Sequence, residues 1–218
     1  MAQFSRHSKS IAASIPTTRR LPSYLETAKR HLKEGNDTIS STIIADELDL
    51  EAIQVRKDIG ATGITGKPRV GYPTGELINA IERFLGWDQN CKAIIVGAGN
   101  LGSALMGYME LKDHGLIITA AFDVSEELVG IRKNGTAVYH ISQLIPMAPK
   151  MKAALAILTV PSSETQTVCD TIVKAGINQI WNFTNVLPRV PEEVLVLRED
   201  LSSGYAVLTA MKSSGNGK

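Results

Sequence analysis

The sequence predicts an α/β fold built from two domains, and three observations support this prediction. Apolar side chains recur at helical spacing over residues 18–59, glycines punctuate residues 60–73, and from residue 92 short apolar runs alternate with helical stretches. Strands that alternate with helices are typical of a doubly wound parallel sheet. We therefore expect a flexible tail at 1–15, a helical domain at 16–85, an α/β domain at 86–200, and a further helix with a short tail at 201–218.

Composition and charge limit the class of protein. The 218 residues are 44% hydrophobic, and no apolar run is long enough to cross a bilayer. The N-terminus lacks the apolar core of a secretory signal, so we expect a cytoplasmic protein without membrane contact. Residues 1–75 contain 11 Lys and Arg against 8 Asp and Glu, a net +3, and the remainder contains 12 against 14, a net −2. This distribution suits an N-terminal domain that meets an anion.

The N-terminal domain is predicted to contain four helices and a hairpin. Ser40 and Ser41 have the character of caps before the second helix. The apolar spacing predicts helices over about 22–34, 43–48, 51–59 and 74–85, with a glycine-rich hairpin through 60–73. Three short helices, the last two joined by a tight turn, followed by such a hairpin, are typical of a winged helix-turn-helix domain.

The third helix is a candidate for contacting DNA. Ala52, Val55 and Ile59 would face inward, which leaves polar side chains outward and on the flank. Cations suit phosphates and guanine edges, and an amide suits a base edge. The candidate DNA contacts are Gln54, Arg56 and Lys57 on this helix, Lys67 and Arg69 on the hairpin, and Arg19 and Arg20 before the first helix. A solvated surface helix is the alternative for these charges.

The α/β domain is predicted to contain five strands, at about 93–96, 117–122, 153–160, 177–181 and 194–197. Helical stretches begin near Leu101 and Ser163, and the weakest pattern begins near Ser125. The last segment, from Leu201 to about Ser213, is a helix that would be marginal alone and needs something to pack against. Its apolar face comprises Leu201, Tyr205, Leu208 and Met211.

A glycine motif opens the α/β domain. Gly97-Ala98-Gly99-Asn100-Leu101-Gly102 directly follows the first strand and begins a helix, which is the context in which GxGxxG binds a dinucleotide. Gly97 permits a tight turn, Gly99 lets the backbone approach the pyrophosphate, and Gly102 lets the helix pack against the strand. The phosphates would then lie at the helix N-terminus. A glycine turn without a ligand is the alternative.

Asp123 ends the second strand, 21 residues after Gly102, which is close to the spacing of a ribose-binding carboxylate. A carboxylate repels a 2′-phosphate, and no Lys or Arg follows before Arg132, so NAD(H) is favoured over NADP(H). The ends of two later strands would line the same crevice. These further cofactor candidates are Thr159, Val160, Pro161, Asn182 and Phe183, for which ordinary loop connections are the alternative.

Ten short segments carry a family resemblance when they are taken in order: Ile15-Pro16, Arg20-Leu21, Ser40-Ser41, Gln54–Asp58, Gly97–Gly102, Ala121–Asp123, Thr159–Pro161, Ala175–Ile177, Asn182-Phe183 and Asp200-Leu201. In these segments the chain resembles the bacterial redox-sensing transcriptional repressors of the Rex family, from Ile15 to about Met211. The resemblance implies a homodimer that binds double-stranded operator DNA, binds NADH or NAD⁺, and leaves the DNA when NADH binds.

The resemblance also implies roles for particular residues. The C-terminal helix would be swapped onto the partner subunit. Tyr108, on the helix after the glycine loop, and Asp200, before the swapped helix, would form a redox-dependent contact near the nicotinamide. The implied DNA contacts are Arg56, Lys57, Lys67 and Arg69, with Ser41 in a matching segment.

Two other classes of function stay open on the residues alone. The first is an NAD-dependent oxidoreductase, but the α/β part fills 86–200 and leaves no room for a substrate domain. His114 and His140 have no evident Asp or Arg partner there, so we expect neither an enzyme nor a metal site. The second is a cofactor-binding interaction protein that does not touch DNA.

Overall fold

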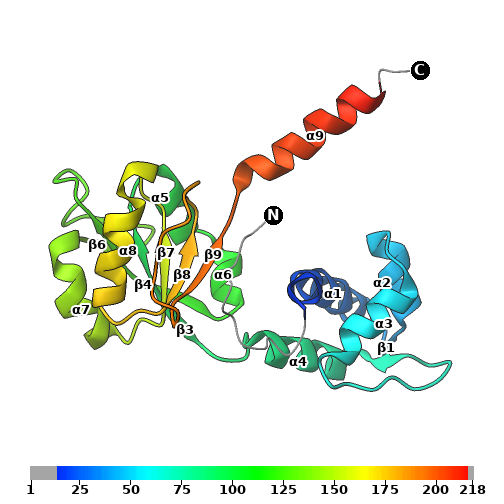
Figure 1. Ribbon diagram of the computed structural model, residues 1–218. Helices are drawn as coiled ribbons and strands as arrows, with labels where there is room; N and C mark the ends of the chain where they lie inside the picture. The colour runs from blue at the N-terminus through cyan, green and yellow to red at the C-terminus, as the bar shows by residue number, and fades with distance from the viewer. Residues whose placement is uncertain (1–13, 216–218) are drawn as a thin grey trace. The chain divides into compact units, whose positions relative to one another are not determined.

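The computed structural model describes residues 14–215, which divide into two compact units at 14–89 and 90–215 (Figure 1). The first unit is mostly helical, and the second is built around a seven-stranded sheet. No helix in the described part of the chain is both long and apolar enough to span a membrane.

The first unit packs helices around one apolar core. Its elements are α1 (Ile15–Lys33), β1 (Thr38–Ile39), α2 (Ser41–Leu48), α3 (Ala52–Gly60), β2 (Tyr72–Pro73) and α4 (Thr74–Leu85). Leu21, Leu25, Ile44, Val55 and Ile81 are fully buried in this core. Because every one of the four helices contributes to it, the core fixes α3 against α1 and α2.

Helix α1 begins earlier than the predicted 22–34. Ser14 caps it by accepting a hydrogen bond from the Thr17 amide, and Pro16 lies in the first turn, where a missing N–H costs nothing. Pro22 lies inside the helix, where it removes one backbone hydrogen bond, and its neighbour Leu21 is fully buried in the core. Of the predicted tail at 1–15, residues 1–13 lie outside the described residues.

The predicted hairpin through 60–73 is wrong in its pairing. Strand β2 pairs antiparallel with β1, which precedes α2, and the glycine-rich stretch contains only an isolated bridge between Lys67 and Gly71. Gly71 has a φ of +96°, and a Cβ there would overlap the carbonyl oxygen of Ile39. Strand β1 has two residues, too few to give an alternating pattern in the sequence.

The second unit has the strand order of a doubly wound dinucleotide-binding sheet. Its elements are β3 (Cys91–Val96), α5 (Asn100–Met106), α6 (Met109–Asp113), β4 (Leu116–Asp123), β5 (Arg132–Lys133), β6 (Thr136–His140), η1 (Ile141–Gln143), α7 (Leu144–Met151), β7 (Leu155–Leu158), η2 (Ser162–Glu164), α8 (Thr165–Lys174), β8 (Gln179–Asn182), β9 (Leu195–Arg198) and α9 (Leu201–Gly215). The sheet order is β5-β6-β4-β3-β7-β8-β9, and all pairs except β5–β6 are parallel. The order therefore reverses between β3 and β7, where such sheets bind ligands.

The helix predicted near Ser125 is absent. Backbone hydrogen bonds from Leu128 and Val129 to the Ser125 carbonyl form a turn instead, and β5, β6 and α7 follow it. Neither β6 nor α7 was predicted. The five residues of β6 include one exposed histidine and two half-buried positions, so its pattern is weak.

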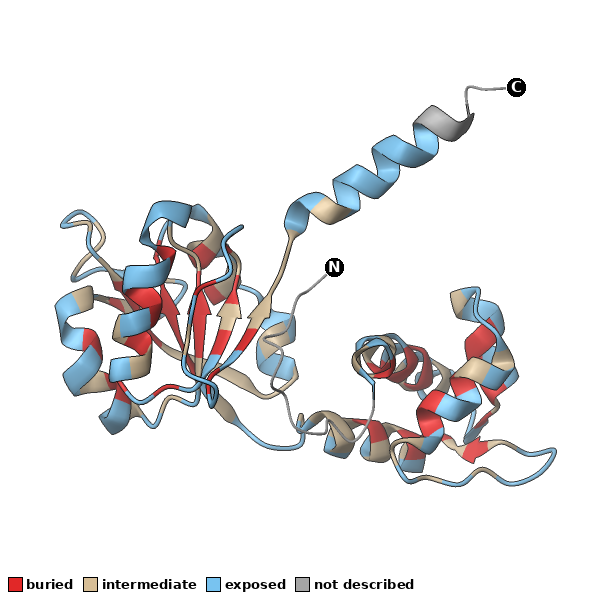
Figure 2. Cartoon of the chain, viewed as in Figure 1, coloured by how far each residue is buried: buried red, intermediate tan, exposed pale blue. Residues whose placement is uncertain are grey.

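Residues along β3 alternate between the two faces of the sheet. Ile94 and Val96 pack with α7 and α8, whereas Ala93 and Ile95 pack with Met106 of α5. Figure 2 shows the central strands as mostly buried and α9 as exposed. The apolar face predicted for α9 is solvent-exposed, with Tyr205 72% accessible, so the described residues of one chain do not cover it.

Candidate functional site

The glycine-rich loop joins β3 to α5, and its three glycines have different surroundings. Gly97 has a φ of +100°, and a Cβ there would lie 2.6 Å from the Thr159 carbonyl oxygen. A Cβ on Gly102 would overlap the carbonyl oxygen of Gly97, whereas one on Gly99 would meet no protein atom within 4 Å. Internal packing therefore requires Gly97 and Gly102. The open side of Gly99 fits the close approach of a dinucleotide pyrophosphate to the backbone.

Asp123 lies beside this loop at the end of β4. Its Oδ2 accepts a hydrogen bond of 2.6 Å from the Ala98 amide, and its Oδ1 accepts one of 2.9 Å from the Ser125 amide. These two contacts fix the carboxylate at the edge of the site, where the residues present fit the ribose of a dinucleotide.

A cavity of about 210 Å³ opens at the point where the strand order reverses. It brings together six of the predicted cofactor residues, namely Gly97, Gly99, Asp123, Thr159, Val160 and Pro161. The other lining residues were not predicted and are Val96, Phe122, Val124, Ile141, Glu164 and Val168. Most of them are apolar, which suits a flat ring. Val96 and Phe122 adjoin predicted motif residues, and the other four belong to no motif that the sequence shows.

Thr159 also holds the glycine loop, and the predicted residues that do not line the cavity have other surroundings. The Thr159 hydroxyl donates to the Gly97 carbonyl over 2.7 Å and so holds the loop in place. Asn182 is fully buried and closes the turn after β8 through hydrogen bonds with Thr184 and Val186, and Phe183 packs against Trp181. Asn182 and Phe183 do not line the cavity. In the glycine loop, Ala98 is buried, Leu101 is half-buried and Asn100 is exposed.

The prediction that Tyr108 lies on the helix after the glycine loop is wrong. Helix α5 ends at Met106, and Tyr108 is the N-cap residue of α6, with its hydroxyl donating to Glu110. That hydrogen bond to the Glu110 carboxylate raises the pKa of Tyr108. The short α5 explains the error, because the apolar spacing continues across the break at Gly107.

Asp200 precedes α9 and is bonded locally. Its Oδ1 accepts hydrogen bonds from the amide and hydroxyl of Ser202, and these bonds, with Arg198 3.8 Å away, lower the pKa of Asp200. Within the described residues of one chain, no hydrogen bond joins Asp200 to Tyr108. The contact between them that the family resemblance implies stays a prediction.

The first unit contains a groove of about 700 Å³ between α3, the start of α2 and the turn at Lys67–Gly71. It brings together four of the predicted DNA contacts, Ser41, Arg56, Lys67 and Arg69. Ser40 caps α2 by accepting a hydrogen bond from the Ile43 amide, and this leaves Ser41 buried in the first turn. Lys57 is exposed on α3 but does not line the groove.

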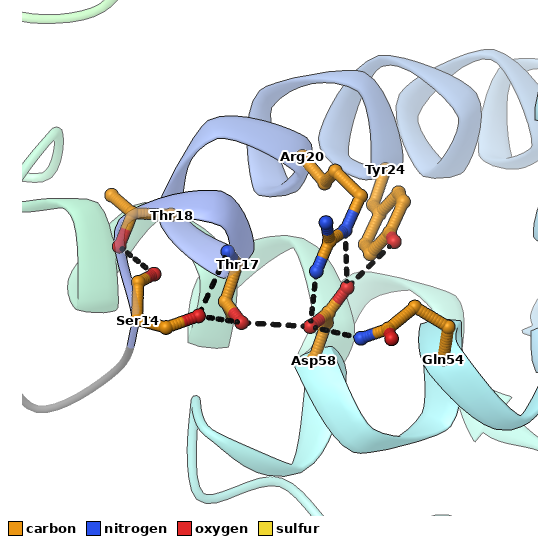
Figure 3. Close-up of polar contacts among 7 residues, drawn as sticks. All are labelled: Ser14, Thr17, Thr18, Arg20, Tyr24, Gln54 and Asp58. Atoms are coloured by element: carbon orange, nitrogen blue, oxygen red, sulfur yellow. Dashed lines mark hydrogen bonds and ion pairs between the residues drawn. The ribbon is translucent and has the colours of Figure 1, made fainter. Parts of the chain in front are cut away.

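Arg20, a predicted phosphate contact, has its guanidinium group bound to a carboxylate of the same unit. Its Nε donates to Asp58 Oδ2 over 2.7 Å and its Nη2 donates to Asp58 Oδ1 over 3.0 Å (Figure 3). This bidentate pair joins α1 to α3. No local pattern predicts this pair, because the two residues are 38 positions apart in the chain.

Asp58 is the centre of a buried polar cluster on α3. Besides Arg20, it accepts hydrogen bonds from Thr17 and Tyr24 of α1 and from Gln54, one turn earlier on its own helix (Figure 3). The Gln54 side chain, predicted to contact DNA, is therefore half-buried with its amide nitrogen held by Asp58. Burial alone would raise the pKa of Asp58, but the hydrogen bonds from Arg20, Thr17 and Tyr24 outweigh it and the pKa is lowered.

The same cluster shifts the pKa of its other members. The hydrogen bond to Asp58 raises the pKa of Arg20, and burial together with that carboxylate raises the pKa of Tyr24 to about 12. At neutral pH the cluster therefore contains one carboxylate, one guanidinium and a neutral phenol.

The close approach of Gly71 to β1 can be tested against a matched glycine. Gly35 and Gly71 both have positive φ, but a Cβ on Gly35 would meet nothing within 4 Å. We expect Gly35→Ala to destabilise the first unit by about 1 kcal/mol through backbone strain alone. Gly71→Ala should lower the free energy of unfolding of the first unit clearly more, because β1 and β2 must also separate. Equal losses in urea denaturation would contradict this account of the turn.

Comparison with known proteins finds matches in both units of the chain. Residues 88–186 match the model of the CoA binding domain family, and residues 13–59 match that of the putative DNA-binding protein N-terminus. The redox-sensing transcriptional repressor Rex of Treponema denticola is 50% identical over 201 residues, which cover 92% of this chain and 96% of that protein. The protein of the same name from Bacteroides thetaiotaomicron is 40% identical, covering 88% of each chain.

Solved structures match over nearly the whole chain. The crystal structure of RSP, a Rex-family repressor, has a TM-score of 0.85 at 29% identity and covers 95% of this chain and 96% of its own. RSP in complex with β-NAD⁺ and operator DNA has a TM-score of 0.86 at 29% identity, covering 96% of this chain and 100% of its own. RSP has also been solved in complex with β-NADH. The chain therefore belongs to the Rex family of redox-sensing transcriptional repressors.

Proposed function

We propose that this protein is a DNA-binding transcriptional repressor that senses the NADH/NAD⁺ ratio and is released from its operator when NADH binds. The observation that carries this proposal is that one chain combines a cation-lined groove in its first unit with a glycine-loop cavity in its second. Two comparisons support the proposal. The relative from Treponema denticola is named a redox-sensing transcriptional repressor, and RSP has been solved with NADH and with NAD⁺ plus operator DNA. Because these relatives are repressors, the protein is a regulator and not an oxidoreductase.

The first unit supplies the DNA-binding surface. Arg56 lines the groove from α3, and Lys67 and Arg69 line it from the turn. Lys57, the next residue on α3, is exposed. We propose that α3 enters the major groove and that the turn contacts the backbone or the minor groove as a wing. The side-chain nitrogen of Gln54 donates to Asp58, so Gln54 would contact the base edges only through its side-chain oxygen.

The second unit supplies the cofactor site. When bound, the dinucleotide supplies a nicotinamide that is positively charged only in its oxidised form. We propose that Gly97–Gly102 hold the pyrophosphate, that Asp123 binds the adenosine ribose, and that Thr159–Pro161 face the nicotinamide half. Asp200 carries a negative charge that would distinguish the two oxidation states, and Tyr108 would be its redox-dependent partner.

Two copies of the chain form the working assembly. The exposed apolar face of α9 supports a homodimer, because such a face needs a partner surface. We propose that residues 201–218 exchange between subunits, that 16–85 bind DNA and that 86–200 bind the cofactor. Operator DNA lies in the bacterial cytoplasm, so we place the protein there.

A mobility-shift assay with operator DNA tests the proposal directly. Arg56→Met with Lys57→Met should weaken operator binding by at least tenfold and reduce the dependence of log Kd on log salt by about one per lost phosphate contact. NADH should release the wild-type protein. The control, Lys33→Met with Lys174→Met, removes the same charge from two exposed helix ends and should bind normally. Operator binding that is unchanged in the first double variant, or no release at saturating NADH, would contradict the proposal.

A further inference from the structure

We infer that Lys133 is a further cofactor-binding residue, whose ammonium group pairs with the pyrophosphate of the bound dinucleotide. The inference rests on the proposed function, because it assigns a new residue to the same cofactor site. It is carried by the hairpin of β5 and β6, which returns to the glycine-rich loop from the edge of the sheet.

The hairpin aims the Lys133 side chain. Strands β5 and β6 are antiparallel, with Lys133 opposite Thr136, so Asn134 and Gly135 alone form the turn. Asn134 has a φ of +47° and Gly135 a φ of +81°, as a tight two-residue Asn-Gly turn requires. A turn of this kind fixes the strand register, so the position of Lys133 is set by the backbone.

Two neighbouring side chains of this hairpin attach to the segment that begins at the glycine loop. Lys133 Nζ donates to the carbonyl oxygen of Ala98 over 2.9 Å, and Asn134 Nδ2 donates to the carbonyl oxygen of Ser103 over 2.8 Å. Asn134 also packs closely on Gly107, where a Cβ would lie 2.7 Å from Nδ2. The hairpin therefore holds both the loop and α5, and the ammonium group is placed one residue from Gly99.

Within the part of the chain that the structure describes, the charge on Lys133 has no counter-ion. Its acceptor is a neutral carbonyl, and no carboxylate of the described residues forms an ion pair with it. Asp123, the acidic residue bonded to the same peptide segment, instead accepts hydrogen bonds from the Ala98 and Ser125 amides. Lys133 is half-buried beside the glycine loop, whose open side at Gly99 can admit an anion. Its ammonium group would bind a phosphate more strongly than the Ala98 carbonyl, because a charge-assisted hydrogen bond is stronger than one to a neutral acceptor.

The position of the contact favours the pyrophosphate over a 2′-phosphate. Lys133 contacts the carbonyl of Ala98 in the glycine loop, whereas a 2′-phosphate would lie at the Asp123 carboxylate. The sequence does not predict this contact, because Lys133 is 10 residues beyond Asp123 and lies on another strand.

Titration calorimetry on the full chain tests the inference with NADH, NADPH, ADP-ribose and adenosine. Lys133→Met keeps most of the length of the side chain and removes its charge, and Lys133→Arg restores a cation. We expect Lys133→Met to weaken NADH and ADP-ribose binding about tenfold, as loss of one charge-assisted contact should, and to leave adenosine binding unchanged. Lys133→Arg should recover most of the affinity. Lys174→Met, at the exposed end of α8, should bind all four ligands as the wild type does.

The other outcomes each have a definite meaning. Equal NADH affinity in Lys133→Met and the wild type overturns the inference. A loss that includes adenosine also overturns it, since Lys133 would then only hold the shape of the loop, and so does a loss confined to NADPH. Failure of the wild-type protein to bind NADH would instead overturn the proposed function. Thermal melting without ligand checks that each variant is folded.

Discussion

Replacing Gly99 with valine is expected to abolish NADH binding, by at least a hundredfold in Kd, while the protein folds normally. Gly99 has a φ of −65°, which any residue can adopt, and an added Cβ meets no protein atom within 4 Å. The isopropyl group would instead occupy the open side of the loop, where the pyrophosphate must approach the backbone. The measurements are NADH titration and thermal melting of the ligand-free protein.

The consequence for regulation is a repressor that no longer responds. Gly99→Val should bind operator DNA as the wild type does and should stay bound at NADH concentrations that release the wild type. Gly75→Val is a matched control, because it also adds an isopropyl group to a glycine with an open surrounding, but in α4. If Gly99→Val binds NADH normally, the open side of the loop is not the ligand site.

The features that the sequence predicted best are local ones. The glycine loop, Asp123 and helix α4 at 74–85 each depend on residues close together in the chain, so spacing alone identifies them. The contacts of Arg20 and Lys133 could not be predicted in this way. Each joins residues more than 30 positions apart, and either cation alone has the pattern of an ordinary surface charge.

Several elements were not predicted because they are short or contain prolines. Strand β1 has two residues and β6 has five, and α7 contains two prolines, so none shows a clear period. The break between α5 and α6 was missed because apolar residues continue on both sides of Gly107. These segments are held by the sheet and by the hydrophobic core, which outweigh their weak local preference.

Replacing Asp58 with asparagine is expected to destabilise the first unit by about 3 kcal/mol, because it removes the buried carboxylate of a partly buried ion pair and leaves Arg20 without its charged partner. Asp58 is 1% exposed and accepts five hydrogen bonds from four side chains, three of them on α1. Asparagine has about the same size but no charge, and its amide nitrogen cannot accept. Asp46→Asn, on the exposed side of α2, is the matched control and should have little effect.

The unfolding of the first unit can be measured separately in the full chain. The protein has two tryptophans, of which Trp87 packs on the first core and Trp181 on the second. In a Trp181→Phe background, fluorescence during urea denaturation therefore reports the first unit. A loss below 1 kcal/mol for Asp58→Asn would show that the cluster contributes little to stability.

Acidification should weaken the same cluster, and the sign follows from the lowered pKa of Asp58. A carboxylate whose folded pKa lies below its unfolded value of about 3.9 stabilises the fold above that pH and loses this contribution as the pH falls through the folded pKa. The difference between wild type and Asp58→Asn should therefore be constant from pH 7 to about 5 and shrink below about 4. A difference that stays constant down to pH 2 would mean that the charge on Asp58 is not what stabilises the unit.

Operator binding distinguishes a structural role for Asp58 from a role in placing Gln54. Tyr24→Phe removes one hydrogen bond on the α1 side, which should cost about 1 kcal/mol of stability and leave operator affinity unchanged. Asp58→Asn also removes the charge that strengthens the hydrogen bond holding the Gln54 side chain on α3, so it should weaken operator binding even at temperatures where both variants are fully folded. Because the same carboxylate anchors α1 and holds Gln54, the stability of this domain and the aim of its recognition helix depend on one residue.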